Sequence, residues 1–191
     1  AEIIGGEVTE IDLSNRPFTA KIDGTESIVE AETVIVCTGA SAKYLGMDDE
    51  KKYMGMGVSA CATCDGFFYR GKTVAVVGGG DTACEEAMYL SQLASKVYMI
   101  VRKDYLRASK VMQQRVMDNP KIEVLFNTVT KALGGDEVLA RATVVTTTPS
   151  TGAQDTYDIA IDGFFLGIGH QPNTAFLRGQ LQLDEAGYIS L

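Results

Sequence analysis

The stretch Val74-Ala75-Val76-Val77-Gly78-Gly79-Gly80-Asp81-Thr82-Ala83 decides the fold of this chain. Its four leading apolar residues predict a buried strand, and the three glycines after them predict a tight turn into a helix. The order strand, glycine turn, helix lets backbone N–H groups approach a pyrophosphate at the positive end of a helix. Because a lone string of this kind is a weak signal, the flanking sequence has to agree with it.

The sequence after the glycine turn alternates between helix and strand patterns. Apolar spacing predicts a helix over about 81–95 and another over about 109–117, with strands over 97–101 and 122–126. With the strand over 73–77, this is the order of a doubly wound dinucleotide-binding unit. The predicted fold class is α/β, a Rossmann-like dinucleotide-binding domain with a three-layer sheet and a β-meander.

The rest of the chain reads mainly as short strands separated by turns. Residues 41–60 are rich in Gly and Met and predict an irregular linker. The meander is predicted from two runs around the turn Pro149-Ser150-Thr151-Gly152. The strands expected outside the doubly wound unit cover 8–13, 18–22, 33–37 (a buried apolar strand), 138–147, 156–161 and 163–168.

Composition indicates an ordinary soluble protein. The chain has 191 residues, of which 46% are hydrophobic and 22% charged, and a net charge of −8. That charge argues against a nucleic-acid partner, since phosphate binding needs a basic face. With no apolar run long enough for a bilayer and no charged-then-apolar leader, a cytoplasmic protein without a membrane partner is the expectation.

Cys61-Ala62-Thr63-Cys64-Asp65-Gly66 is a dithiol motif shortly before the glycine turn. In a reducing compartment such a pair is more often redox-active or metal-binding than a structural staple. A zinc site needs two further ligands, and Cys37, Cys84 and His170 lack ligand spacing, so no metal is expected. We expect Cys37 and Cys84 to be inert small core residues.

A redox role requires one thiol of the pair to ionise near neutral pH and the other to resolve the mixed disulfide. Asp65 follows the pair directly and offers a carboxyl group that takes and returns the proton. The alternative is that Asp65 is a turn residue, since Asp-Gly is a common turn dipeptide.

The end of the second strand predicts which nucleotide binds. An NAD enzyme usually places Asp or Glu there, whereas this chain has Val101-Arg102-Lys103 followed by Arg107. These cations suit a 2′-phosphate and favour NADPH over NAD. The alternative is a solvated basic surface loop.

The run Val58-Ser59-Ala60-Cys61-Ala62-Thr63-Cys64-Asp65-Gly66-Phe67-Phe68-Tyr69-Arg70 resembles the redox-centre signature of bacterial low-molecular-weight thioredoxin reductases. Thr38-Gly39-Ala40-Ser41-Ala42, Glu85-Glu86-Ala87 and Gly167-Ile168-Gly169-His170 with Pro172-Asn173-Thr174 are similar to that family as well. The resemblance spans essentially the whole chain.

The resemblance implies a thioredoxin-disulfide reductase that passes electrons from NADPH through FAD to the active-site disulfide, and then to thioredoxin. It implies that Cys64 is the sulfur next to the flavin, that Cys61 attacks thioredoxin, and that Asp65 is the general acid. It also implies a homodimer for the intact protein.

The nucleotide-binding residues implied by the resemblance come from three places in the chain. Thr38 and Gly39 match flavin-contacting positions. Val101 stands where the family often has His, and Lys103 where Arg is usual, so the preference for NADPH is expected to be less strict. The expected NADPH-binding positions are Gly78, Gly79, Gly80, Asp81, Thr82, Glu85, Arg102, Lys103, Arg107, Ile168 and Gly169.

The chain lacks the glycine fingerprint with which the family's FAD domain opens and the Ala-Gly-Asp segment with which it closes. We therefore expect a fragment: a partial FAD-domain segment over 1–42, the NADPH-binding domain over 43–169, and the start of the return into the FAD domain over 170–191. Such a fragment is expected to bind NADPH, to hold no FAD and to be inactive alone.

Two other functional classes and one other partner fit the sequence. A flavoprotein subunit that reduces a peroxiredoxin shares the Cys-x-x-Cys-Asp-Gly motif, although the Phe67-Phe68-Tyr69-Arg70 run favours thioredoxin reductase. A non-catalytic NADPH-binding module fits because the flavin fingerprint is absent. A zinc-stabilised interaction domain is the third alternative.

Overall fold

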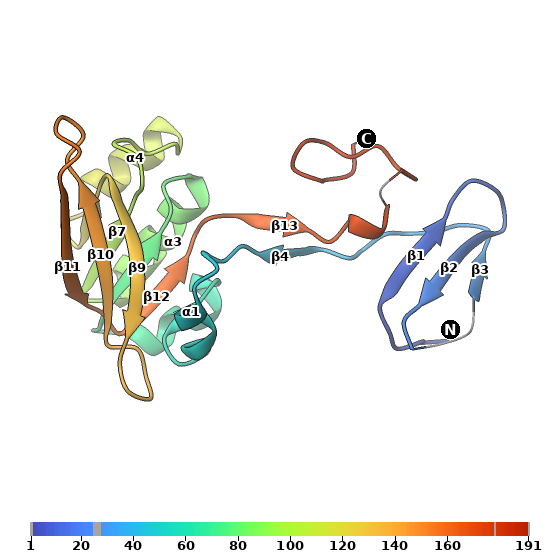
Figure 1. Ribbon diagram of the computed structural model, residues 1–191, viewed down its shortest axis with the longest axis horizontal. Coiled ribbons are helices and arrows are strands. Elements are labelled where there is room, and N and C mark those ends of the chain that lie inside the picture. The colour runs from blue at the N-terminus through green and yellow to red at the C-terminus, as the bar shows by residue number, and fades with distance from the viewer. Residues whose placement is uncertain (1, 25–27, 178, 191) are drawn as a thin grey trace. The chain divides into compact units, whose positions relative to one another are not determined.

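The computed structural model describes residues 2–24, 28–177 and 179–190. The chain divides into two compact units, one formed by residues 1–41 with 170–191 and the other by residues 42–169 (Figure 1). The larger unit contains both the glycine turn and the Cys-x-x-Cys motif.

A parallel sheet forms the centre of the larger unit. Within the described residues its strand order is β5-β12-β6-β7-β8, and each of its neighbouring pairs is parallel. The predicted succession of three strands, separated by the glycine turn with its helix and by a second helix, is confirmed by β6, β7 and β8. The strands are β5 (Val58–Ser59), β6 (Thr73–Val77), β7 (Lys96–Ile100), β8 (Ile122–Leu125) and β12 (Gly163–Leu166).

Helices cover one face of this sheet and a second sheet covers the other (Figure 1). The helices are α3 (Asp81–Leu93) and α4 (Lys110–Met117). The second sheet is an antiparallel meander of β9 (Thr128–Gly134), β10 (Arg141–Thr147) and β11 (Gln154–Ala160), of which β9 was not predicted. The predicted α/β fold with a three-layer sheet and a β-meander is confirmed.

The side chains of β6 show why its sequence is apolar throughout. Val74 and Val76 belong to the core cluster on the helix side, whereas Ala75 and Val77 belong to the cluster on the meander side. Successive residues of a strand point to opposite faces, so a strand buried on both faces needs an unbroken apolar run.

Residues 41–60 are more ordered than the predicted irregular linker. They contain α1 (Asp48–Lys52), with three acidic residues in its first turn and two lysines in its last. The buried Glu50 carboxylate accepts hydrogen bonds from the N–H groups of Leu45, Gly46 and Met47 at 2.8–3.0 Å. This charge-assisted set fixes the chain that leads into the larger unit.

The smaller unit contains a three-stranded antiparallel sheet in the order β1-β2-β3. The strands predicted over 8–13 and 18–22 are confirmed as β1 and β2. A second, two-stranded sheet pairs β4 with β13, where the chain passes between the two units. The elements are β1 (Val8–Asp12), β2 (Phe18–Ile22), β3 (Ile28–Ala31), β4 (Ala40–Ala42), β13 (His170–Pro172) and the 3₁₀ helix η2 (Ala175–Leu177).

The buried strand predicted over 33–37 is wrong. These residues are in no strand, Ile35 is 88% exposed, and Cys37 is an exposed free cysteine rather than a core residue. An apolar run forms a buried strand only where another strand pairs with it, and no described residue does so here.

Close backbone packing surrounds the glycine turn. Gly78 has φ +137°, a region that side-chain-bearing residues rarely adopt. A Cβ on Gly78 would lie 2.8 Å from the Cβ of Ala83 and closer still to the carbonyl oxygen of Gly167. The turn therefore needs a residue without a side chain at this position.

We expect Gly78→Ala to lower the free energy of unfolding by roughly 3 kcal/mol, because the new methyl group meets backbone atoms and the φ angle becomes strained. Urea unfolding followed by circular dichroism measures the change. Gly80→Ala is the matched control, since no atom lies within 4 Å of a Cβ there, and we expect it to cost about 1 kcal/mol or less. Equal costs for the two variants would contradict this account of the turn.

Candidate redox and nucleotide site

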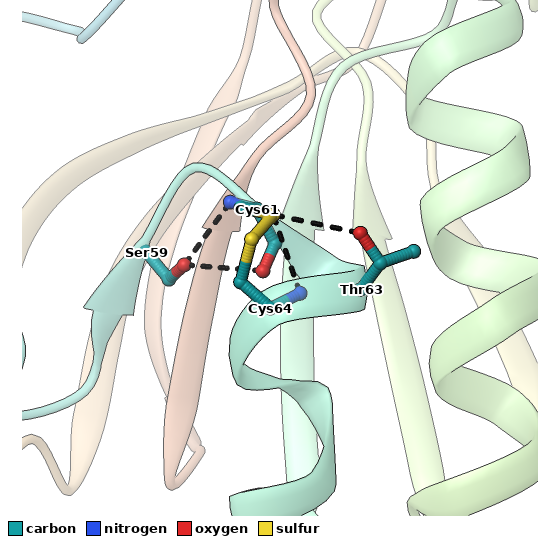
Figure 2. Close-up of a disulfide and its surroundings, with 4 residues drawn as sticks. All are labelled: Ser59, Cys61, Thr63 and Cys64. Atoms are coloured by element: carbon teal, nitrogen blue, oxygen red, sulfur yellow. Dashed lines mark hydrogen bonds between the residues drawn. A yellow bond between two sulfur atoms is a disulfide. The ribbon is translucent and has the colours of Figure 1, made fainter.

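Cys61 and Cys64 form a disulfide at the start of α2 (Ala62–Asp65), with their Cα atoms 5.3 Å apart (Figure 2). Cys61 is the N-cap residue of this short helix, and the 3₁₀ helix η1 (Gly66–Tyr69) follows directly. The Oγ of Ser59 accepts a hydrogen bond from the Cys61 N–H at 3.1 Å. The motif predicted to be a redox pair is therefore joined by a disulfide in the structure.

Two polar groups surround the sulfur of Cys61 (Figure 2). The Cys64 N–H donates to Cys61 Sγ at 3.2 Å, and the Thr63 hydroxyl lies 3.5 Å from the same sulfur. Once the disulfide is reduced, both groups can donate to a thiolate on Cys61, and donors of this kind favour the ionised form. Cys61 is half-buried beside these two groups, whereas Cys64 is exposed.

The redox turn, defined as residues 61–66, packs on α3. Ala62 is buried in the same core cluster as Ala83 and Ala87 of that helix. A Cβ on Gly66 would lie 3.1 Å from side-chain atoms of both Tyr89 and Leu90, so the turn approaches the helix closely. Helix α3 thus connects the glycine turn at its N-terminus with the disulfide beside its second turn.

Asp65, the predicted general acid, ends α2, and its N–H donates to the carbonyl of Cys61 at 3.1 Å. Burial first, and then the carboxylates of Asp65 and Asp162, raise the pKa of Tyr69. The Asp65 carboxylate is half-buried and lies one residue from Cys64 in the chain.

The two other cysteines differ from each other. Cys84 is fully buried on α3, as predicted. Burial, together with the charges of Asp81 and Glu85, raises the pKa of its thiol to about 11. Cys84 is therefore an unreactive core residue, whereas Cys37 is accessible.

A cavity of about 460 Å³ opens at the carboxyl ends of the parallel strands, within the larger unit. This is where nucleotides bind in open α/β sheets, and the volume lies in the range of ligand pockets. Of the predicted nucleotide-binding residues, those that line it are Gly78, Gly79, Arg102, Lys103, Arg107 and Ile168.

The glycine turn holds the cationic loop in place. The carbonyl of Gly79 accepts hydrogen bonds from the N–H groups of Arg107 and Ala108 at 2.6 and 3.2 Å. At the first residue of α3, the Asp81 carboxylate accepts from the Ser109 N–H at 2.9 Å. These contacts hold the backbone of the loop that carries Arg107 against the glycine turn.

The cavity fits the nucleotide predicted for it. The turn presents no side chain at Gly78, three cations stand on one wall, and Thr130 places on another wall a buried hydroxyl with no partner among the described residues. A polar ligand that enters the cavity would satisfy that hydroxyl. Among the described residues the cavity wall includes none of Gly80, Asp81, Thr82, Glu85, Gly169, Cys61, Cys64 and Asp65.

Sequence reasoning missed part of this wall. Leu45 and Met47 line the cavity from the segment that Glu50 holds, and Thr128 and Thr130 line it from β9. The acidic run before Lys51-Lys52 is a helix-start signal from which α1 was predictable, although residues 41–60 were predicted to be an irregular linker. No local signal in the sequence places β9 beside the ends of β6 and β7.

Thr38 and Gly39, the positions predicted to contact flavin, lie in the smaller unit. The Thr38 hydroxyl donates to the carbonyl of Asn173 at 2.7 Å, and Gly39 has φ +64°. The described residues of this unit form no α-helix, so they offer no helix N-terminus for a pyrophosphate.

Within residues 2–24, 28–177 and 179–190, no group of three or more His, Cys, Asp or Glu side chains is placed to hold a metal ion. No helix in the same residues has the length and apolar character needed to span a bilayer.

The profile of the pyridine nucleotide-disulphide oxidoreductases matches residues 1–191. The chain belongs to this family. Membership accords with a redox disulfide and a nucleotide cavity in one unit of the fold.

The relatives most similar in sequence include several thioredoxin reductases. The chain is 46% identical to the thioredoxin reductase of Coxiella burnetii over 191 residues and 45% identical to that of Escherichia coli O157:H7 over 193 residues. These alignments cover 98% and 100% of this chain but only 58% and 59% of the relatives. The chain therefore spans less than two thirds of the length of these relatives.

Solved structures agree with the sequence comparison. The thioredoxin reductase of Giardia duodenalis superposes with a TM-score of 0.83 and 39% identity, covering 98% of this chain and 60% of that one. The enzyme from Streptococcus pyogenes MGAS5005 gives a TM-score of 0.81 and 36% identity, covering 96% and 58%.

We expect iodoacetamide at pH 8 to alkylate Cys37 and to leave Cys84 unmodified while the disulfide is intact. With a pKa about three units above the assay pH, roughly one Cys84 thiol in a thousand is ionised, and burial blocks access to it. Peptide mass spectrometry locates the label. The Cys37→Ser variant should take up no label until it is unfolded in urea; labelling of Cys84 in the folded protein would show that the thiol is accessible.

Proposed function

We propose that this chain is the NADPH-binding and disulfide-bearing part of a thioredoxin reductase. The observation that supports this most directly is the presence of the Cys61–Cys64 disulfide and a cavity with three cations in the same compact unit, residues 42–169. The names of the relatives supply the substrate class, a thioredoxin disulfide. A non-catalytic nucleotide-binding module would have no use for the disulfide.

The proposed reaction moves two electrons from NADPH to a protein disulfide. FAD, when bound, supplies the chemistry that converts the hydride of NADPH into an electron pair for the Cys61–Cys64 bond. Flavin contacts at Thr38 and Gly39 stay a prediction that rests on the resemblance to thioredoxin reductases. What this chain's own residues do is bind NADPH and exchange thiols with the partner.

The exchange step uses the two cysteines in different roles. With the pair reduced, the Cys61 thiolate attacks the partner's disulfide and one partner sulfur leaves as a thiolate. The Cys64 thiol then attacks Cys61 Sγ, reforms the Cys61–Cys64 bond and releases the reduced partner. Asp65 is proposed to donate the proton that the departing partner sulfur needs and to recover one from Cys64.

The surface beside the disulfide suits a protein substrate. Phe67 and Phe68 of η1 follow the redox turn directly and are 63% and 71% exposed. The Arg70 guanidinium lies 5.2 Å from the centre of the Phe67 ring, which supports the ring at the surface. Two exposed aromatic rings next to a reactive disulfide offer the apolar contact area by which protein partners bind.

The cations in the cavity support NADPH as the cofactor. Arg102, Lys103 and Arg107 line one wall, and such side chains bind a 2′-phosphate through charge-assisted hydrogen bonds. A homodimer and a cytoplasmic location complete the proposal, and both rest on the resemblance to thioredoxin reductases.

We expect the purified chain to bind NADPH at least tenfold more tightly than NADH, because only NADPH carries the 2′-phosphate. Isothermal titration calorimetry on the wild type, Arg102→Ala and Arg107→Ala measures this; each variant should lose about tenfold in NADPH affinity and little in NADH affinity. Lys110→Ala is the control, since Lys110 belongs to the same basic stretch but does not line the cavity. Equal affinities for the two nucleotides in the wild type would contradict the cofactor assignment.

We expect the chain, reduced with dithiothreitol and desalted, to reduce about one equivalent of oxidised thioredoxin in a single turnover without NADPH or FAD. Thiol alkylation of thioredoxin followed by mass spectrometry measures the transfer. Cys64→Ser should trap a mixed disulfide through Cys61, whereas Cys61→Ser should trap little. Transfer to a peroxiredoxin disulfide but not to thioredoxin would favour the peroxide-reducing system instead.

A further inference from the structure

Glu86 lies on the face of α3 that packs against the redox turn. Leu90 and Leu93, four and seven residues further on, share this face, and both lie within 3.4 Å of a Cβ built on Gly66. The Glu86 side chain is half-buried, and its Oε2 atom is fully buried with no hydrogen-bond partner among the described residues. A buried carboxyl oxygen without a partner is rare and needs an explanation.

The Glu86 carboxyl is connected to the disulfide through one peptide group. It accepts a hydrogen bond from the N–H of Ala62, the residue that follows Cys61 and begins α2. Amide donors beside a cysteine stabilise its thiolate. Here the Ala62 N–H donates to the Glu86 carboxyl group and is not available to Cys61. The negative charge of that carboxylate lies beside the residue on which the Cys61 thiolate forms.

The other titratable groups near this face are on the two packed elements. The redox turn carries Asp65, the η1 segment after it carries Tyr69 and Arg70, and α3 carries Glu85 and Tyr89. Arg70 lies over the Phe67 ring, and no described cation forms an ion pair with Glu86. The carboxylate is therefore not neutralised by a described neighbour.

We propose that Glu86 is a positioning residue that keeps the reduction potential of the Cys61–Cys64 pair low, by holding the Ala62 N–H and opposing a thiolate on Cys61. The proposal deepens the reductase function proposed above, because it assigns to a residue outside the motif the tuning of the same disulfide. A low potential drives electrons from this dithiol to a partner's disulfide.

The charge balance of reduction gives the sign of the effect. Two electrons break the Sγ–Sγ bond; with two protons the products are two thiols, and with one proton they are a Cys64 thiol and a Cys61 thiolate. A carboxylate destabilises only the product that contains the thiolate. The effect of Glu86 on the potential therefore grows with pH as Cys61 begins to ionise.

Deprotonation of Glu86 also makes its effect on the reduction potential grow with pH. Burial raises the pKa of the Glu86 carboxyl, and the Ala62 hydrogen bond offsets part of that rise. Below that pKa the group is neutral and no longer opposes a thiolate. Wild type and a neutral variant should therefore have the same potential in acid and different potentials in mild alkali.

The test is the redox equilibrium of the 191-residue chain with dithiothreitol and its cyclic disulfide, in the wild type and in Glu86→Gln. The glutamine keeps an oxygen that accepts from the Ala62 N–H, so the turn is retained. Alkylation and peptide mass spectrometry give the ratio of reduced to oxidised Cys61–Cys64. We expect this ratio to rise three- to tenfold in Glu86→Gln at pH 8 and to be unchanged at pH 5.5; tenfold corresponds to about 30 mV.

Glu137→Gln is the matched control, since Glu137 is exposed in a loop, and it should leave the ratio unchanged at both pH values. Equal ratios for wild type and Glu86→Gln at both pH values would overturn the proposal. A shift of the same size at both pH values would overturn it too, because a purely structural role does not depend on the charge.

A second measurement needs no variant. Carbon-13 NMR of labelled glutamate follows the Glu86 carboxyl in the oxidised and in the reduced wild-type chain. By reciprocity its pKa should be higher in the reduced chain, where a thiolate stands nearby; identical titrations would refute the coupling. Neither measurement uses NADPH, FAD or thioredoxin, so a failure here is distinct from a failure of the proposed function, which would appear as absent NADPH binding or absent thioredoxin reduction.

Discussion

At the carboxyl ends of β6 and β12, Gly78 and Gly167 lie against Ala83 with no room for a Cβ on either glycine. This approach places the first turn of α3 over the end of the sheet. From there the carbonyl of Gly79 and the carboxylate of Asp81 hold the loop that carries Arg107, and the following turns of α3 pack against Ala62 of the redox turn. The nucleotide cavity and the redox turn therefore both depend on α3. The position of this helix requires glycine, which has no side chain, at positions 78 and 167.

The parts that could be predicted from the sequence are those in which local chemistry and tertiary structure agree. The apolar strand before Gly78, the helix after it and the Cys61–Cys64 pair carry their signals within a few residues, and all three are in the structure. The cations at 102–107 were predicted from their position after the second strand, because strand order fixes where that loop lies.

The remaining features depend on contacts between distant residues. Thr130 reaches the cavity because the meander packs on the parallel sheet, and no pattern near Thr130 indicates that packing. Ile35 and Cys37 were wrongly predicted to lie in a buried strand. Their apolar run has a local strand pattern, but no strand among the described residues pairs with it. Glu86 lies in a segment that the resemblance covers, but only the structure shows its contact with Ala62.

The Glu50 carboxylate has a mechanical consequence for the chain on either side of it. By accepting from three successive amides it holds Leu45 and Met47 in the cavity wall, and the Lys43 N–H donates to the carbonyl of Gly169, the last residue of the larger unit. The nucleotide cavity and the disulfide are therefore built within the same unit, residues 42–169, and that unit supplies every residue that lines the cavity.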